Sequence, residues 1–287
     1  MNKFTPTKLA IFSSLAAALL VGASPAISKT VGDDVIEKNR AALEMNTDGK
    51  GFGPQSPRDI DSKEGTNKRV FGFAAPSTQM NLCNIHFHKN AEHKGGEFTT
   101  YAGNGDGKGY MTGFKYDGAL SAAETKPVNK NICAAKGGSL MAGDTIELHY
   151  VYTSNDIKPG PTLGACLSDS SMNPGLRVEG QVFVLVNDDD ALDFEDLAKV
   201  EQRDGYYQAV NIPNNTGTPV EYIGSTTGPS FNEKASPLKV SWSVRPQVAK
   251  VDINSVGEWC ESNEFNEDHA HGVRNLVTNE KLLSPIK

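Results

Sequence analysis

The sequence predicts a mainly β (α+β) fold, arranged as a single domain with few and short helices. Short runs rich in β-branched, aromatic or alternating apolar residues are separated by stretches of Gly, Asn and Pro, as at 103–107 and 213–217. The chain has 287 residues, and a single β-rich domain commonly reaches about 200–250 residues. No internal repeat divides the sequence, so one large domain is the simplest interpretation.

The first 26 residues are typical of a secretory signal peptide. Lys3 and Lys8 precede an apolar run at 9–21, and small residues follow at 22–26. An uncleaved membrane anchor is the alternative, but the run is shorter than the roughly 20 apolar residues that span a bilayer. We therefore expect a periplasmic or secreted protein that has no membrane contact after cleavage.

A polar segment, 27–52, follows the signal peptide and contains one helical pattern at 33–43. The remaining residues, 53–287, form the expected main domain. Its β-rich runs predict five strands, at 70–74, 84–88, 145–153, 178–186 and 238–244. The segment 193–202 is the other expected helix.

Charge and cysteine content narrow the class of protein further. With 28 Lys and Arg against 35 Asp and Glu, the formal net charge is −7, which argues against a nucleic-acid-binding protein with a basic face. An exported chain meets an oxidising environment, so its four cysteines are expected to form two disulfides. Spacing cannot choose among the three pairings. We favour Cys83–Cys260 and Cys133–Cys166. The sequence is also compatible with a homo-oligomer.

Two histidines in one predicted strand suggest a metal site. His86 and His88 are two residues apart, so both imidazoles project from the same face of the strand, while Ile85 and Phe87 face the opposite side. A polar surface pair is the alternative interpretation. If the two rings bind one metal, a third ligand must come from another segment.

His149 is the favoured third ligand. In the strand 145–153 it shares a face with Glu147, a carboxylate suited to hold the second ring nitrogen of an imidazole. Three neutral imidazoles with an open fourth position are typical of a catalytic zinc site. His93, five residues after His88, is the competing candidate, although it lies beyond the strand.

These residues together resemble the α-type carbonic anhydrases. The zinc signature of that family has a His-x-His strand, a Glu-His pair and a Glu-Leu-His strand in this order. The matching segments are Ile85-His86-Phe87-His88, Glu92-His93 and Glu147-Leu148-His149, with Gln55-Ser56-Pro57-Arg58-Asp59-Ile60 before them and Tyr222-Ile223-Gly224-Ser225-Thr226-Thr227-Gly228-Pro229 after them.

The chain also departs from the α-type pattern. Only 25 residues separate Ile60 from His86, and the segment that carries the α-type proton-shuttle histidine is absent. The block 81–93 is more similar to the δ-class, known from marine diatoms, and to its bacterial carbonic-anhydrase-like relatives. The resemblance therefore implies a δ-type enzyme with an α-like site.

The resemblance implies a large, mostly antiparallel, twisted β-sheet and the reversible hydration of CO2 to bicarbonate by a zinc-bound hydroxide. One zinc ion per chain, replaceable by Co²⁺ or Cd²⁺, would be held by His86, His88 and His149. The implied catalytic pair is Thr226, which would orient the hydroxide, and Glu92, which would accept the proton of Thr226. The other implied site residues are Thr227 near the bicarbonate, Val151 and Val178 in the apolar wall, and Glu147, His93 and Tyr222 behind the ligands.

Two other functions remain open. His86, His88 and Glu92 also fit the first motif of cupins, which bind iron or manganese, although His149 follows Gly143 by six residues rather than the three of the second cupin motif. A carbonic-anhydrase-like binding protein without catalysis is the second alternative. His269 and His271 are expected in an exposed tail.

Overall fold

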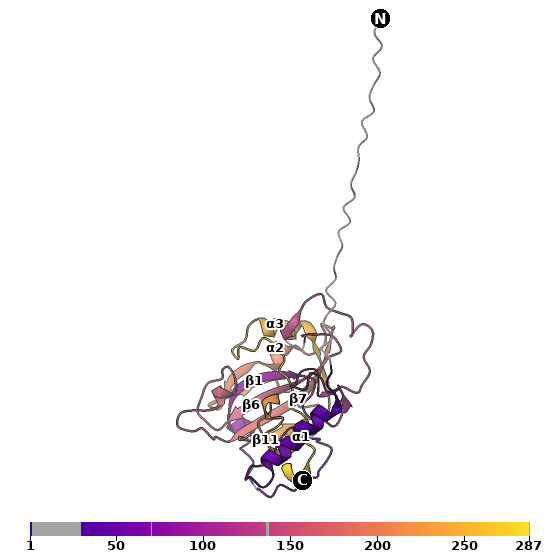
Figure 1. Cartoon of the computed structure of the whole chain (residues 1–287). Helices are drawn as coiled ribbons and strands as arrows, with labels where there is room; N and C mark the ends of the chain where they lie inside the picture. The colour runs from indigo at the N-terminus through magenta and orange to yellow at the C-terminus, as the bar shows by residue number, and fades with distance from the viewer. Residues whose placement is uncertain (2–29, 70, 136–137, 287) are drawn as a thin grey trace.

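The structure is a computed structural model that describes residues 1, 30–69, 71–135 and 138–286 (Figure 1). Apart from Met1, the expected signal peptide at 1–26 lies outside the described residues. Within the described ranges, no helix has the length and apolar character needed to cross a membrane.

A six-stranded sheet forms the centre of the molecule and confirms the predicted mainly β, single-domain fold. Five strands follow one another in the order β1, β6, β7, β11 and β10, and β12 pairs with β7 beyond the end of β11. The β1–β6, β6–β7 and β10–β11 pairings are antiparallel, whereas β11 and β12 both run parallel to β7. The strands are β1 (Asn81–Lys89), β6 (Thr145–Thr153), β7 (Leu176–Val186), β10 (Val220–Ser225), β11 (Lys239–Val244) and β12 (Ala249–Asp252).

Smaller elements surround the sheet. The longest helices among the described residues are α1 (Asp33–Thr47) and α3 (Ile253–Glu261), and α2 (Phe194–Leu197) is a single turn. Three strand pairs lie outside the sheet: β2 (Thr100–Tyr101) with β3 (Phe114–Lys115), β4 (Ile132–Ala135) with β5 (Gly138–Leu140), and β8 (Val200–Arg203) with β9 (Tyr206–Ala209). The 3₁₀ turns are η1 (Ser77–Gln79), η2 (Leu163–Cys166), η3 (Pro229–Phe231) and η4 (Glu280–Leu282).

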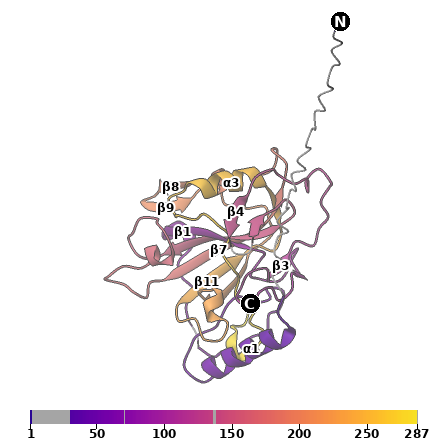
Figure 2. The same ribbon diagram turned by 45° about the horizontal axis from the view of Figure 1, so that its top comes forward.

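Helices cover the sheet from opposite sides, as Figure 2 shows: α3, β4 and the β8–β9 pair lie on one side and α1 on the other. On the α3 side, apolar side chains of β1 and β6 pack against Phe194, Val256 and Trp259 in one buried cluster. Helix α3 begins at Asp252, whose carboxylate accepts hydrogen bonds from the backbone N–H groups of Asn254 and Ser255.

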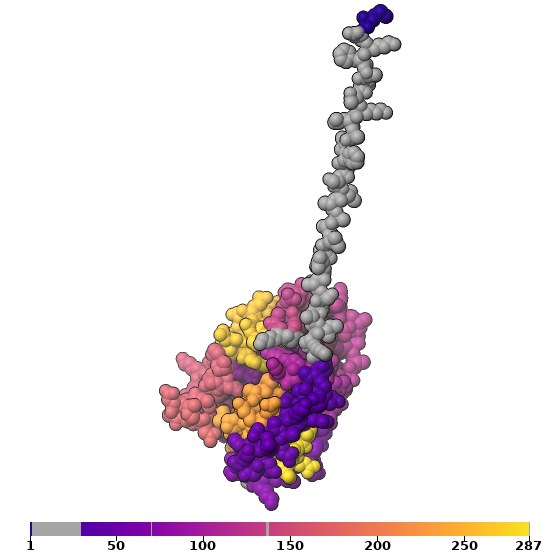
Figure 3. Space-filling view, viewed as in Figure 1, coloured from indigo at the N-terminus to yellow at the C-terminus, as the bar shows by residue number. Residues whose placement is uncertain are grey.

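Helix α1 belongs to the polar N-terminal segment yet packs against the main domain. Asp33 and Asp34 lie in its first turn, where negative charge stabilises a helix. Its Leu43 joins Val277, Leu282 and Leu283 in a small buried cluster. In Figure 3 the indigo helix and the yellow C-terminal residues accordingly lie side by side on the surface. The C-terminal segment therefore anchors the N-terminal one.

Several element predictions need correction. The helix expected at 193–202 ends at Leu197, and its last residues form strand β8. Residues 71–74 are not a strand, and the backbone N–H of Ala74 donates to the side-chain oxygen of Ser241. Val70 lies outside the described residues. Strand β10 was not predicted, and it includes the first half of the matching segment 222–229.

The predicted disulfide pairing is wrong. The structure joins Cys83 to Cys166 and Cys133 to Cys260, with Cα–Cα distances of 5.0 and 5.7 Å. Helix α3 carries Cys260 to the side of the sheet where β4 holds Cys133, whereas Cys83 contributes to the cluster on the opposite face. Neither Cys83–Cys260 nor Cys133–Cys166 forms, because the members of each pair lie on different faces of the sheet.

Candidate metal centre

Three histidines meet on the face of the sheet opposite α3. His86 and His88 come from β1, and the antiparallel register places His149 of β6 directly opposite His86. One nitrogen from each ring lies within 4.8 Å of the other two. His88 and His149 are buried, and His86 is partly buried. The alternation of side chains along two paired strands therefore assembles the expected cluster without a special loop.

Each ring has one nitrogen that is committed to a protein acceptor. His86 Nδ1 donates to Asn84 Oδ1 at 2.7 Å, and His88 Nδ1 donates to the Gly272 carbonyl oxygen at 3.0 Å. His149 Nε2 donates to Glu147 Oε1 at 3.0 Å. The nitrogens left free are therefore Nε2 of His86, Nε2 of His88 and Nδ1 of His149.

These free nitrogens fit a zinc ion. His88 Nε2 is buried and has no hydrogen-bond partner among the described residues, and a buried polar atom of this kind is stabilised by a donor or a metal ion beside it. His86 Nε2 and His149 Nδ1 are 3.3 Å apart, and two nitrogens that bind one tetrahedral zinc at about 2.0–2.1 Å are separated by about 3.3 Å. The three imidazole nitrogens could therefore hold a metal ion, and the spacing of His86 Nε2 and His149 Nδ1 is compatible with zinc.

Burial also keeps the three rings in the neutral form that binds metal. It lowers the pKa of His88 to about 3 and lowers the pKa values of His86 and His149. At neutral pH the metal would therefore displace no proton from these rings.

Glu147 connects the ligands to the buried residues behind them. Its Oε2 accepts hydrogen bonds from the backbone N–H groups of Glu92 and His93 at 2.7 and 3.1 Å, and its Oε1 accepts from the rings of His93 and His149. Burial alone would raise the pKa of Glu147, but these donors, with the His93 ring first among them, hold the pKa well below its ordinary value. Glu147 is therefore a buried carboxylate that fixes two imidazoles.

His93 lies behind Glu147, where both of its ring nitrogens are occupied. Nδ1 is 2.7 Å from Glu147 Oε1 and Nε2 is 2.7 Å from the hydroxyl of Tyr222, which contacts Ser56 in turn. His93, Glu147 and His149 form a second group of side chains whose ligand atoms lie close enough together to hold a metal ion. Because its nitrogens already have partners, it is less suited to bind metal than His149.

Glu92 lies between the histidines and the loop after β10. Its Oε1 accepts from the backbone N–H of Arg274 at 3.0 Å, and its Oε2 is buried with no hydrogen-bond partner in the described part of the chain. Burial raises the pKa of Glu92, and the hydroxyl of Thr227 is close enough to oppose that rise. The close groups of metal-binding atoms found among the described residues do not include Glu92, so the cupin ligand set is not assembled there.

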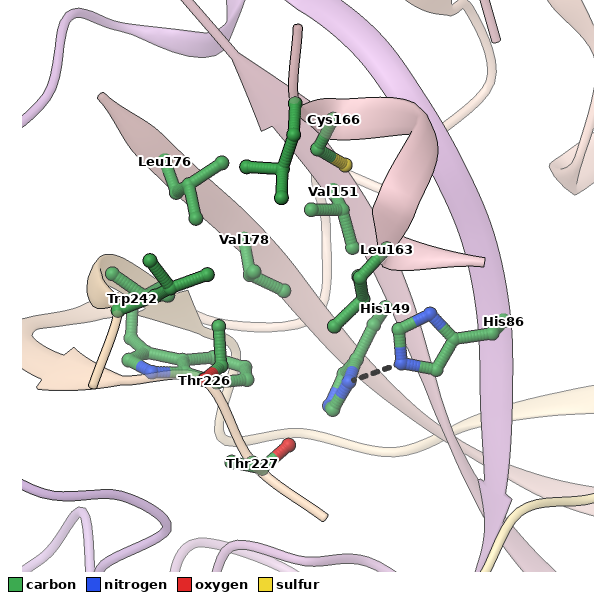
Figure 4. A pocket seen from close by; sticks show the side chains of 13 residues that line it. His86, His149, Val151, Leu163, Cys166, Leu176, Val178, Thr226, Thr227 and Trp242 are labelled. Carbon is green, nitrogen blue, oxygen red and sulfur yellow. Dashed lines mark hydrogen bonds between the residues drawn. The ribbon is translucent and has the colours of Figure 1, made fainter. Parts of the chain in front are cut away.

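The two neighbouring threonines have different partners. The hydroxyl of Thr226 is hydrogen-bonded to that of Ser236, whereas Thr227 is the threonine beside Glu92. Figure 4 shows the hydroxyl of Thr227 on the side of the pocket where His149 and His86 lie. The expected role of Thr226 stays a prediction, and Thr227 is a second candidate for that role.

An apolar cavity adjoins the histidines (Figure 4). Its volume is about 30 Å³, room for only one or two water-sized molecules. The lining includes the expected Val151 and Val178, both threonines and Trp242, whose ring centroid is 5.0 Å from that of His149. The remaining lining residues are Leu163, Cys166, Leu167, Leu176, Leu238 and Val240. Such a cavity admits a very small nonpolar molecule beside the free nitrogens.

The sequence analysis missed several contributors to this site. Asn84 is two residues before His86 and shares its face, a signal that the strand alternation contained. Gly272 and Arg274 contact the site through backbone atoms and left no such signal. His271, expected in an exposed tail, lies at the edge of the cluster, with its ring centroid 5.5 Å from that of His86 and Nε2 2.6 Å from Glu267.

A comparison with known families agrees with this geometry. A family model described as delta carbonic anhydrase matches residues 77–255, which is more than half of the chain. The matched region contains the three histidines, Glu92, Glu147 and both threonines. No curated protein matches the chain.

Proposed function

The chain belongs to the delta carbonic anhydrase family, and from that membership we propose that it catalyses the reversible hydration of CO2 to bicarbonate and a proton. The observation that carries the proposal is the convergence of three free imidazole nitrogens next to a small apolar cavity. The same nitrogens would also suit a binding protein, but the neighbouring Glu92 and Thr227 favour a catalyst.

We propose zinc as the metal, held by His86 Nε2, His88 Nε2 and His149 Nδ1. When bound, zinc would supply the Lewis acidity that activates water for attack on a carbon centre, a role for which carbonic anhydrase is itself the standard example. Co²⁺ and Cd²⁺ are expected to bind the same nitrogens, because imidazole accepts several divalent metals.

Three acceptors would orient the ligands. Asn84, the Gly272 carbonyl and Glu147 each receive the proton of one ring and thereby fix its tautomer and its direction. Glu147 is hydrogen-bonded to His149, and the carboxylate of Glu92 lies 3.8 Å from His88 Nδ1, so a negative charge lies near two of the three rings.

We assign the proton relay to Thr227 and Glu92. A threonine hydroxyl that donates its hydrogen to Glu92 has its own lone pairs free to accept a hydrogen bond from the attacking water, so the oxygen of that water would be directed towards the cavity. The unpartnered Oε2 of Glu92 supports this role, since a donor completes its hydrogen bonding. Thr226, held by Ser236, is then a wall residue.

The apolar wall would bind CO2. Val151, Val178 and Trp242 present carbon surface to the cavity, and a nonpolar substrate gains from leaving water for such a surface. The cavity volume excludes large molecules without any specific contact to CO2.

We also propose that the protein acts outside the cytoplasm. Both disulfides need an oxidising compartment to persist, and the N-terminal sequence has the pattern of a signal peptide.

The proposal is tested by zinc analysis and stopped-flow CO2 hydration of the purified, zinc-loaded protein. We expect about one zinc per chain and a hydration rate well above that of buffer. His149→Ala should lose both, while His271→Ala, a matched histidine outside the ligand set, should keep its zinc. A zinc-loaded parent without CO2 hydration would reject the enzyme, and zinc retained by His149→Ala would reject the ligand set.

A further inference from the structure

The cavity has two walls of different origin. The inner wall comes from the sheet, through Val151, Val178, Val240 and Trp242. The outer wall comes from the connection between β6 and β7, where the 3₁₀ turn η2 contributes Leu163 and Cys166 and the next residue is Leu167. In Figure 4, Leu163 lies beside His149 and His86, across the pocket from Trp242. An irregular connection thus closes a cavity that the sheet leaves open.

Leu163 is the most exposed of these residues. Its side chain is 37% exposed, whereas Cys166 is 1% exposed and the strand valines are buried. A leucine that both lines the cavity and reaches solvent lies at the rim, where it limits the width of the entrance. Truncation at this position would widen the site without removing a buried side chain.

The outer wall is bonded to strand β1, which carries His86 and His88. The disulfide joins Cys166 to Cys83, three residues before His86. The backbone N–H of Gly160 donates to the Cys83 carbonyl at 3.0 Å, and the hydroxyl of Thr153 donates to the Cys166 carbonyl at 2.8 Å. The connection is therefore held on both sides of Leu163.

Asn84 links this wall to a ligand ring. Its Nδ2 donates to the Gly160 carbonyl at 3.2 Å, and its Oδ1 accepts from His86 Nδ1. A single buried amide thus fixes the position of the wall and the direction of the ring together. The distance between Leu163 and the free nitrogen of His86 is consequently set by rigid contacts.

The backbone at the start of the turn is also constrained. Thr162 has φ 59° and ψ 168°, a combination that glycine adopts far more readily than a β-branched residue. Such a conformation persists when the surrounding contacts determine it, and the disulfide and hydrogen bonds around 160–168 provide those contacts.

We propose that residues 160–168 form a fixed outer wall and that Leu163 is its specificity-determining residue, which restricts the metal site to ligands and substrates of the size of CO2. Small linear molecules pass the rim, and contact with Leu163 weakens the binding of compounds with a large aromatic ring. This inference rests on the proposed function for the identity of the small substrate.

The test compares a bulky and a small ligand on the Co²⁺-loaded protein, whose visible absorption reports ligand binding without turnover. The bulky probe is a naphthalenesulfonamide and the small probe is azide. Leu163→Ala should tighten sulfonamide binding by roughly tenfold or more, since removing carbon bulk from an apolar pocket changes selectivity by about 10–200-fold, and should leave azide affinity unchanged. Leu163→Phe should weaken sulfonamide binding.

Leu192→Ala is the matched control, because Leu192 is 41% exposed and lies outside the cavity lining. It should leave both affinities unchanged. Equal shifts for the two ligands in Leu163→Ala, or no shift in either, would overturn the inference. The parent could bind Co²⁺ and show no CO2 hydration, while Leu163→Ala changes the ratio of sulfonamide affinity to azide affinity. That result would support the role of Leu163 and reject the proposed function. If the parent hydrates CO2 and Leu163→Ala leaves the ratio of the two affinities unchanged, the proposed function is supported and the role of Leu163 is rejected.

Discussion

The two faces of the central sheet are built from the same strands but bury different kinds of side chain. On the α3 face, Ile85 and Phe87 of β1 pack against Leu148 and Tyr150 of β6 in an apolar core. On the opposite face, the residues between them are His86, Glu147 and His149. Because successive side chains of a strand point to opposite faces, residues of the apolar core alternate with residues of the metal site along each strand.

The two faces also satisfy their buried atoms differently. The apolar face is held by close packing and leaves the buried hydroxyl of Tyr150 without a partner among the described residues. The site face uses a backbone carbonyl, Asn84 and Glu147 to occupy one nitrogen of every ligand ring. Two of its buried atoms, His88 Nε2 and Glu92 Oε2, have no partner among the described residues. Neighbouring substitutions can therefore affect one face and spare the other, and four predictions test this separation.

The largest expected effect concerns the disulfides, because one lies on each face. The bonds span 83 residues for Cys83–Cys166 and 127 residues for Cys133–Cys260, so removing either should lower the free energy of unfolding by about 4–5 kcal/mol on the chain-entropy estimate. Urea unfolding of the two double Cys→Ala variants checks this. Only Cys83→Ala with Cys166→Ala should also change ligand selectivity at the metal site. A peptide map that joins Cys83 to Cys260 would contradict the pairing.

Phe87→Ala and His86→Ala separate the faces at adjacent residues. Phe87→Ala should lower the free energy of unfolding by about 3–5 kcal/mol, because it leaves a cavity in the core, while the folded protein still binds zinc. His86→Ala should lose zinc but change the stability of the metal-free protein by only about 1 kcal/mol. Denaturant unfolding and zinc analysis measure the two effects. Zinc loss in folded Phe87→Ala would mean that the faces are not independent.

The relay gives a smaller effect that is confined to the site face. Thr227→Ala should keep zinc and slow CO2 hydration by roughly 10²-fold, which is about 2.7 kcal/mol of barrier, while Thr227→Ser should retain much of the rate. Thr226→Ala is the matched control and should slow the reaction far less, because its hydroxyl pairs with Ser236. Stopped-flow assays at equal zinc content compare them. A larger loss in Thr226→Ala than in Thr227→Ala would support the expectation from the sequence and contradict the assignment of Thr227.

The smallest effect is the pH dependence of the metal-free protein. Burial lowers the pKa of His88 to about 3, while a histidine in the unfolded chain has a pKa of about 6.5. Between these values the unfolded chain holds a proton that the folded chain lacks, so stability falls as pH is lowered, by up to about 1.4 kcal/mol per pH unit for each such histidine.

Urea unfolding between about pH 5 and 6 tests this slope after removal of metal by a chelator. His88→Gln should reduce the slope by about one histidine's share. Phe87→Leu, on the other face, should lower stability by a constant amount and leave the slope unchanged. An unchanged slope in His88→Gln would show that His88 is protonated in the folded chain or that its ring is not effectively buried.

The sequence by itself determined the features that depend on strand alternation. The spacing of His86, His88, Glu147 and His149 predicted which side chains share a face, and the structure brings them together. Strands β1, β6, β7 and β11 were predicted for the same reason, since the alternation of apolar residues is a local property of the chain. Helix α3 could have been found from Asp252 as its first cap and from Ile253, Val256 and Trp259 on one face.

Only the tertiary structure decided the features that depend on which distant segments meet. The pairing of Cys83 with Cys166 follows from the path of the β6–β7 connection, and the hydrogen bond of Thr226 to Ser236 follows from where strand β10 ends. Gly272 and Arg274 reach the site through backbone atoms, which every residue type possesses. Such contacts leave no pattern in the sequence, because side-chain chemistry and spacing do not encode the approach of one backbone to another.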